Sequence, residues 1–337
     1  MKNLIVYFLS LAFLLFSGCN KKKDLKGVDF RAEMVNFVHG ISTYAKSADP
    51  EFLIIPQNGE QLVDDELYLG CIDGIGREDL SYGYDHDGEA TSSSDRGEIL
   101  PFIDKVAAAG KVVLVTDYVF SDSEDNPHYD YSTQEKINNA YQFSTGRGYI
   151  PYATVRNLNY LTINPGHEPD VDSIVTIADV KSFLYYLQPA GSVSKDKFIQ
   201  DISLTNYDIV IMDMTYDGLD EFSAQQIQDI RSGLNGGKGG YVLAYMSIGE
   251  AEDYRFYWDE AWTKRNGNPS ADAPEWLYKE NPDWEGNYKV LYWKDEWKNI
   301  IFGNEDAYLD KIMKKGYDGV YLDIIDGFEY FEDIMGE

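Results

Sequence analysis

Basic residues are scarce in this sequence. Lysine and arginine together number 29 against 58 aspartates and glutamates, which gives a formal net charge of −29. Nucleic acids and anionic lipid surfaces are bound through a basic face, so neither is an expected partner. The acidic balance suits a cationic or a neutral ligand. It also keeps an exported protein soluble, and composition alone leaves both explanations open.

Histidine and cysteine are scarce as well, with four and two residues. The histidines are scattered and form no His-x-His or His-x-x-x-His pair, so a zinc hydrolase is not expected. The Gly-x-Ser-x-Gly motif of acyl-transferring serine enzymes is missing. No glycine-rich stretch has the spacing of a phosphate-binding or dinucleotide-binding loop. We therefore expect neither a metal nor a cofactor.

Long hydrophobic runs are limited to one, Leu4–Phe16, which follows the basic Lys2 and is too short to span a bilayer comfortably. Ser17-Gly18-Cys19 comes next and resembles the bacterial lipobox, in which the cysteine becomes the lipidated N-terminus. We therefore expect a signal peptide over residues 1–18 and a tether over residues 19–29. The protein would be exported and would contact the bilayer through its N-terminal lipid. An uncleaved anchor or an ordinary signal peptide is the alternative.

Lipidation of Cys19 would leave Cys71 as the only thiol, so no intrachain disulfide is expected. The remaining region, residues 30–337, must then be held together by its hydrophobic core, and it is long enough to bury one. No change in composition divides this region. We expect a single domain.

Short β-branched or aromatic runs alternate with amphipathic helical patterns along this domain. Buried parallel strands are expected over Phe52–Pro56, Val112–Thr116, Tyr149–Val155, Tyr207–Met212, Tyr241–Met246 and Gly319–Leu322, with weaker candidates at Cys71–Ile75 and Phe183–Leu187. Helices are expected over Arg31–Ala48, Glu98–Ala109, Ser223–Leu234 and Asp306–Lys315. About eight strands with interleaved helices predict an α/β fold, a (β/α)₈ TIM barrel. An open doubly wound sheet is disfavoured because no phosphate-binding loop is present.

Polar residues follow nearly every expected strand, where a barrel builds its active site. They are Gln57 and Asn58, Glu78 and Asp79, Asp117 and Tyr118, Arg156, Asp213, Glu250, Glu252 and Arg255, and Asp323 and Asp326. Strand ends are often polar because they meet solvent, but the concentration of carboxylates is unusual. Several acids around one mouth raise some pKa values and leave others ionised, as cleavage of a glycosidic bond requires.

All six tryptophans lie between Trp258 and Trp297. This stretch follows a strand end, which predicts a long excursion at the catalytic face. Indole rings stack on the flat C–H faces of sugars, but they also form cores. We expect two or three of these rings to be core and one or two to contact substrate, with Trp258 and Trp293 as the candidates.

Four motifs resemble those of glycoside hydrolase family 114, the endo-α-1,4-polygalactosaminidase-like barrels. They are Leu243–Arg255, Asn281–Tyr288, Gly319–Asp326 and Pro56–Gly59. The resemblance implies a TIM barrel that hydrolyses an amino-sugar polysaccharide, a cationic polymer when deacetylated. The motif order departs from the family, because Arg31–Arg156 precedes the motifs that come first there. The sequence therefore looks circularly permuted.

The resemblance also implies an aspartate at the end of the fourth family strand and a glutamate at the end of the sixth. These map to Asp323, as nucleophile or charge stabiliser, and to Glu78, as general acid/base, with Asp79 as the alternative acid. Further residues would bind sugar or set pKa values. They are Gln57, Asn58, Asp117, Tyr118, Asp213, Glu250, Glu252, Arg255 and Asp326.

Two other functions remain open at this point. The first is a barrel that binds glycan at the cell surface without cleaving it. The second is a hydrolase of another sugar, such as a neutral α-glycan. The sequence does not distinguish retention from inversion at the anomeric carbon, and the separation of the two carboxyl groups would.

Overall fold

The structure is a computed structural model that describes residues 25–121, 127–189, 191 and 193–336. The expected signal peptide, Cys19 and the first part of the tether lie outside these residues. Among the described residues, none of the helices combines the length and apolar character that a membrane crossing needs.

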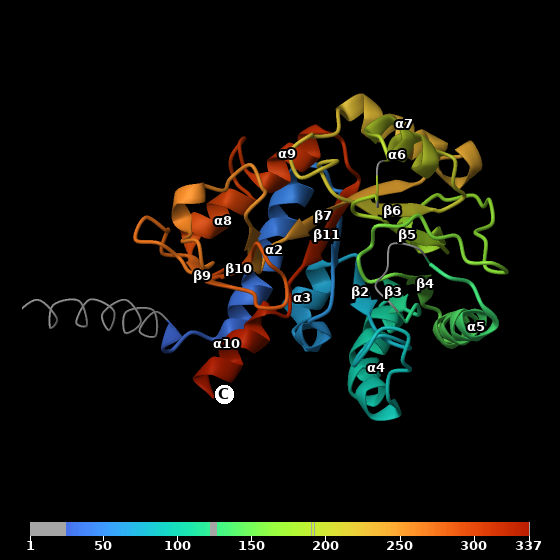
Figure 1. Cartoon of the computed structure of the whole chain (residues 1–337), viewed down its shortest axis with the longest axis horizontal. Helices are drawn as coiled ribbons and strands as arrows, with labels where there is room; N and C mark the ends of the chain where they lie inside the picture. The colour runs from blue at the N-terminus through green and yellow to red at the C-terminus, as the bar shows by residue number, and fades with distance from the viewer. Residues whose placement is uncertain (1–24, 122–126, 190, 192, 337) are drawn as a thin grey trace, which may run out of the picture.

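Eight parallel strands of the described chain lie at the centre of the body, with helices around them (Figure 1). Five form one sheet, in the order β1 (Leu53–Pro56), β11 (Gly319–Asp323), β7 (Tyr241–Ser247), β6 (Ile209–Met212) and β5 (Phe183–Tyr185). Three form a second sheet, in the order β2 (Gly74–Glu78), β3 (Val112–Tyr118) and β4 (Ile150–Thr154). The fold is therefore α/β with parallel sheets, as expected.

The two sheets approach each other. A parallel bridge between Gln57 and Gly76 joins the end of β1 to β2, and β4 lies beside β5. This arrangement brings the carboxyl ends of all eight to one side, where parallel α/β folds place their sites.

Helices cover the outside of the strands. They are α2 (Phe30–Ala48), α3 (Glu66–Cys71), α4 (Ser93–Ala108), α5 (Tyr131–Thr145), α6 (Lys195–Ser203), α7 (Ala224–Gly237), α8 (Asp295–Ile301), α9 (Tyr308–Lys314) and α10 (Gly327–Met335). Short 3₁₀ turns occur at Glu60–Asp64, Ile177–Asp179 and Glu260–Trp262. In α2 the side chain of Asp29 caps the first turn, and the apolar stripe read from the sequence is the buried face.

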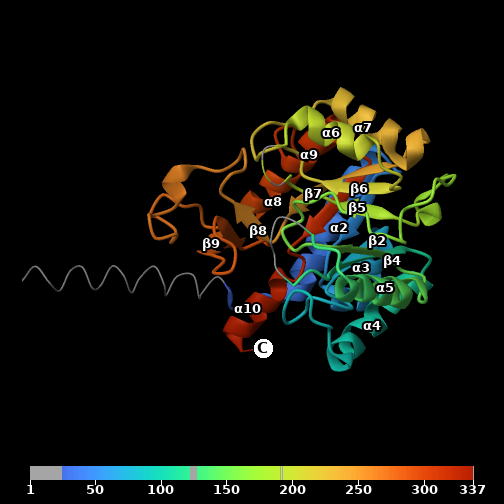
Figure 2. The ribbon, with the colours of Figure 1, turned by 45° about the vertical axis from the view of Figure 1, so that its right-hand side comes forward.

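The excursion after β7 is a small antiparallel sheet that projects to one side of the body (Figure 2). It consists of β8 (Glu250–Glu252), β10 (Asn287–Val290) and β9 (Leu277–Glu280). The sequence does not predict these strands, because each is only three or four residues long and shows too little alternation to be recognised.

Most of the tryptophans form the core of this excursion. Trp276 and Trp297 are buried and pack with ring centroids 4.8 Å apart. Trp258 packs on Trp262 and Tyr288, and Trp293 packs on aromatic rings of α2 and α10. The two tryptophans predicted to meet substrate are thus both held in aromatic clusters. The most exposed indole is Trp284, at 51%.

The expected strand Cys71–Ile75 is displaced in the structure. Residues 66–71 form α3, whose first turn is capped by Asp65 through the backbone N–H groups of Leu67 and Tyr68. The strand begins only at Gly74. The N-cap outweighs the short apolar run, because it satisfies backbone groups that would otherwise be unpaired.

Gly76 in β2 makes room for a side chain of the opposite sheet. A Cβ atom at this position would lie 1.8 Å from the hydroxyl of Tyr321, which is fully buried in β11. The ring of Tyr321 also packs edge-on against Tyr185, with centroids 5.1 Å apart, so it has no free direction in which to move. The glycine is required by a close approach of two side-chain layers.

We expect Gly76→Ala to destabilise the protein by about 1–3 kcal/mol, because it overpacks the layer beneath the strand ends. Chemical denaturation measures this change. Gly70→Ala is the matched control, since a Cβ there meets nothing within 4 Å. Equal stability of the two variants would contradict the packing argument.

Candidate active site

Two carboxylates from different sheets lie side by side at the strand ends. Glu78 ends β2 and Asp323 ends β11. The side-chain nitrogen of Gln57 donates to both, at 2.7 Å to Glu78 Oε2 and 3.0 Å to Asp323 Oδ1. Because these two bonds share one nitrogen, the two carboxylate oxygens are at most 5.7 Å apart. The structure therefore brings together the two acids that the sequence paired.

The remaining carboxylate oxygens also have fixed donors. Asn58 Nδ2 donates to Glu78 Oε2 at 2.9 Å, and the Tyr118 hydroxyl donates to Glu78 Oε1. The Tyr245 hydroxyl donates to Asp323 Oδ2 at 2.6 Å. Hydrogen bonds of this kind lock the rotamers of both acids and favour their charged forms. Asn58 holds its position with a left-handed backbone, at φ 58°.

Glu78 influences the ionisation of Asp323. Burial, and then the negative charge of Glu78, raise the pKa of Asp323 to about 8. The charged form of Asp323 is therefore disfavoured near neutral pH.

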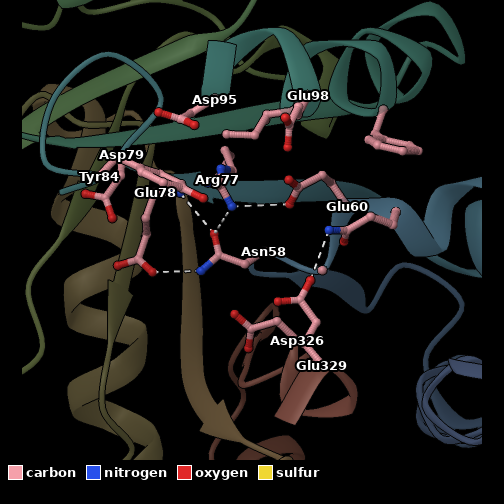
Figure 3. A pocket seen from close by; sticks show the side chains of 14 residues that line it. Asn58, Glu60, Arg77, Glu78, Asp79, Tyr84, Asp95, Glu98, Asp326 and Glu329 are labelled. Carbon is pink, nitrogen blue, oxygen red and sulfur yellow. Dashed lines mark hydrogen bonds and ion pairs between the residues drawn. The ribbon is translucent and has the colours of Figure 1, made fainter. Parts of the chain in front are cut away.

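A cavity of about 400 Å³ opens beside Glu78 (Figure 3). Its lining is mostly acidic. The charged lining residues are Glu60, Arg77, Glu78, Asp79, Asp95, Glu98, Asp326 and Glu329. Arg77 is the one cation among them. Its guanidinium donates hydrogen bonds to Glu60 and to the side-chain oxygen of Asn58, both at 3.3 Å. The cavity thus presents net negative charge to a ligand.

Two acids across the cavity from Glu78, Asp326 and Glu329, also have raised pKa values. Burial, the charge of Glu329 and the charge of Glu78 raise the pKa of Asp326 to about 7. The pKa of Glu329 is raised by burial and by Glu60. Burial is the largest cause of both shifts, and the neighbouring negative charges add to it, so a bound cation would lower both pKa values.

Asp79 points away from the carboxylate pair, although it is next to Glu78 in sequence. Its carboxylate binds Arg156 at 3.0 Å, and the same guanidinium binds Asp87 at 2.6 Å. Burial and the charge of Glu78 raise the pKa of Asp79 to about 7. The geometry therefore favours Glu78 over Asp79 as the partner of Asp323.

Three predicted sugar ligands form a closed ionic cluster instead. Arg255 binds Asp213 through two bonds of 2.8 and 2.7 Å and binds Glu252 at 2.6 Å. The side chains are 0%, 3% and 2% exposed. Because water does not reach them, they are positioned to hold the excursion against β6 rather than to contact a sugar.

Two further predicted ligands are also buried. Asp117 is 0% exposed and accepts the backbone N–H groups of Ser81 and Tyr82, which fixes the loop after β2. Glu250 is 1% exposed and accepts from Asn281 at 2.9 Å and from Lys289 at 3.1 Å. Neither lines the cavity.

Sequence reasoning missed several residues of the site. Tyr245 was not singled out, although it lies directly opposite Tyr321 in the ladder of β7 and β11, two residues before the strand end. The alternation of side chains along a strand could have identified Tyr245, because a period of two puts Tyr245 and Ser247 on the same face. Glu60, Asp95, Glu98 and Glu329 lie on helical segments and carried no strand-end signal.

Comparisons with known proteins identify a family that part of the chain resembles. Residues 186–335 match the model of glycoside-hydrolase family GH114. That match includes Asp323 but not Glu78, so the pairing of the two acids comes from the geometry. The matched range is the later part of the chain, from the end of β5 to α10.

Three relatives, each described only as an uncharacterized protein, match parts of the chain. One from Methanocaldococcus jannaschii is 45% identical over 40% of this chain and 35% of its own length. One from Thermotoga maritima is 40% identical over 44% of this chain and 40% of its own length. One from Deinococcus radiodurans is 39% identical over 29% of each chain. This chain thus spans two-fifths or less of the length of these relatives.

Proposed function

The chain is GH114-like over residues 186–335, and from this premise we propose that it is a glycoside hydrolase that cuts a polysaccharide with Asp323 and Glu78. One observation carries the proposal: a single amide nitrogen contacts both carboxylates, at 2.7 and 3.0 Å, beside an open acidic cavity. Two carboxylates on either side of a scissile bond are the machinery of most glycosidases.

The spacing of the acids favours retention of configuration. Retaining enzymes hold their carboxyl groups about 5–5.5 Å apart, whereas inverting enzymes need roughly 6.5–9.5 Å to admit a water molecule. The limit of 5.7 Å between the bridged oxygens fits the first class.

The reaction then has two steps. An oxygen of Asp323 attacks C1 of the sugar, the bond from C1 to the glycosidic oxygen breaks, and Glu78 gives its proton to that oxygen. Water next attacks C1, Glu78 takes its proton and Asp323 leaves, so that one water is consumed overall. In the first step, attack requires an ionised Asp323, and departure of the glycosidic oxygen requires a proton on Glu78.

Incubation with polysaccharides, followed by measurement of released reducing ends, tests the activity. A slowly turned-over fluorinated sugar should label the nucleophile covalently, and mass spectrometry should find the label on Asp323. A label on Glu78 would reverse the two roles. Binding of a glycan without release of reducing ends would favour a non-catalytic surface receptor instead.

The substrate is an amino-sugar polymer with free ammonium groups. The acidic lining of the cavity and the raised pKa of Asp326 and Glu329 support this substrate class, because a cation would relieve the repulsion there. A neutral α-glycan would gain nothing from these charges.

We expect Glu98→Gln to raise KM several-fold on a deacetylated polymer and to leave KM unchanged on the acetylated one. Glu98 lines the cavity but makes no contact with the carboxylate pair. Raising the salt concentration should have the same effect as the substitution, because the attraction is screened. Glu135→Gln, on the exposed side of α5, is the control. Equal kinetics on both polymers at every salt concentration would exclude a cationic substrate.

The eight parallel strands form a closed barrel whose chain order is permuted relative to the family. The contacts of β1 with β2 and of β4 with β5 support closure. Permutation is supported by the matched range, which begins at residue 186, directly after β5, and leaves β1 to β5 outside it. A chain rejoined in family order, with the new ends between β4 and β5, should fold and keep its activity.

The N-terminus carries the lipid anchor predicted from residues 1–19. Metabolic labelling with an alkyne fatty acid tests this directly. Labelling of the natural chain and its loss in Cys19→Ala are the expected results. Equal labelling of both chains would exclude Cys19 as the lipid site.

A further inference from the structure

We infer that Gln57 is a positioning residue, which holds Glu78 and Asp323 at their working separation and contacts no sugar itself. This inference rests on the proposed function, because the separation matters only if the two acids act on one bond. From the sequence alone, Gln57 is either a sugar ligand or a residue that sets pKa values. The structure distinguishes the two.

The side-chain donors of Gln57 are fully used. Its nitrogen carries two hydrogens, and one is donated to each carboxylate. The residue is 4% exposed. A sugar hydroxyl would therefore have to displace one of the acids to reach this nitrogen, and the side-chain oxygen of Gln57 is itself buried.

The backbone of Gln57 spans the same junction as its side chain. The N–H of Gln57 donates to the carbonyl of Leu322 in β11 at 2.8 Å, and the N–H of Asn58 donates to the carbonyl of Gly76 in β2 at 2.9 Å. These two strands carry Asp323 and Glu78, and they belong to different sheets. Gln57 and its neighbour thus connect the two ladders at the point where the acids face each other.

The bridge also affects how the pair ionises. A donated hydrogen bond favours the charged form of each acid. Without it, the two carboxyls lose a shared donor and the repulsion between them is less well compensated. Loss of the bridge should therefore raise the apparent pKa of Asp323 and loosen the geometry of the two acids.

Gln57→Met tests this inference, because it keeps the length of the side chain and removes the donor. We expect kcat to fall about 100-fold, as for a misplacement near 1 Å. KM should stay within about threefold, and the acidic limb of the kcat profile should move to higher pH. Gln225→Met, on the exposed side of α7, is the matched control and should behave as the natural chain. A raised KM with unchanged kcat would identify Gln57 as a sugar ligand and overturn the inference.

A second measurement does not depend on turnover. Infrared spectroscopy follows protonation of carboxyl groups, and the signal of Asp323 is the part that Asp323→Asn removes. This signal should titrate at higher pH in Gln57→Met than in the natural chain. If no glycan is cleaved but the titration moves, the proposed function fails and the bridge stands. If glycans are cleaved and the titration does not move, the bridge fails.

Gln57→Asn is a second variant that tests the inference even if Gln57→Met does not fold. It keeps the amide but is one methylene shorter, so it cannot hold both acids at their present distances. The same fall in kcat and the same pH shift are expected. Natural kinetics in this variant would overturn the inference.

Discussion

Asp323→Asn is expected to lower kcat by about 10⁴-fold or more while the protein stays folded. Asparagine fills the same space but cannot form the ester with C1. The partners of Asp323, Gln57 and Tyr245, can still hydrogen-bond to an amide. The measurement is release of reducing ends by the purified variant, with circular dichroism to check the fold.

Asp229→Asn is the matched control for this substitution. Asp229 is exposed on α7, where it accepts from Gln225 at 2.8 Å, far from any proposed chemistry. It should keep full activity. Activity of Asp323→Asn within tenfold of the natural chain would remove Asp323 from the mechanism, and the two-step reaction with it.

The same variant should be more stable than the natural chain in mildly alkaline solution. The folded pKa of Asp323, about 8, lies above the unfolded value near 3.8. Between these values the folded state binds more protons, so stability is lost as pH rises through this window. Asparagine has no proton to lose there. We expect its melting temperature to equal or exceed that of the natural chain at pH 9, a stability gain at the expense of activity.

Most of the parallel strands and the helix α2 could be predicted from the sequence because their patterns are local, whereas the 15-residue helix α5 was missed. The period of α2 and the β-branched runs of β3, β6 and β7 identify these elements within a residue or two at most ends. The small sheet β8–β9–β10 could not be predicted in this way. Its strands are short, and the pairing of β8 with β10 joins residues 35 to 39 positions apart, which only the folded chain defines.

The site was predictable in part for the same reason. The carboxyl ends of the strands converge in a parallel fold. The polar residues that follow each strand therefore predict that Glu78 and Asp323 lie at the same end of the fold. That rule does not say which polar residues face the cavity. Asp117 and Arg255 also follow strands, but they are turned inward to satisfy backbone groups or opposite charges. Burial of this kind depends on side-chain directions that no strand-end motif encodes.

Arg255→Met is expected to destabilise the protein by about 3–5 kcal/mol, the largest stability change predicted here. Arg255 neutralises Asp213 and Glu252 in a site where all three side chains are at most 3% exposed. Removing the cation would leave two buried carboxylates facing each other without a counter-charge. Arg147→Met is the control, because its pair with Asp104 is exposed and should contribute about 0–1 kcal/mol. Chemical denaturation measures both changes.

A second substitution separates loss of charge from loss of packing. Adding Asp213→Asn to Arg255→Met removes one of the stranded carboxylates, so it should recover part of the lost stability. No recovery would mean that the cluster acts through packing alone.

The cluster also bears on the reaction, because Glu252 ends β8 and the preceding Ile248 donates its N–H to the carbonyl of Asp323 at 3.1 Å. Loosening the excursion at Arg255 should therefore lower kcat through the position of Asp323, and the double variant should recover activity along with stability.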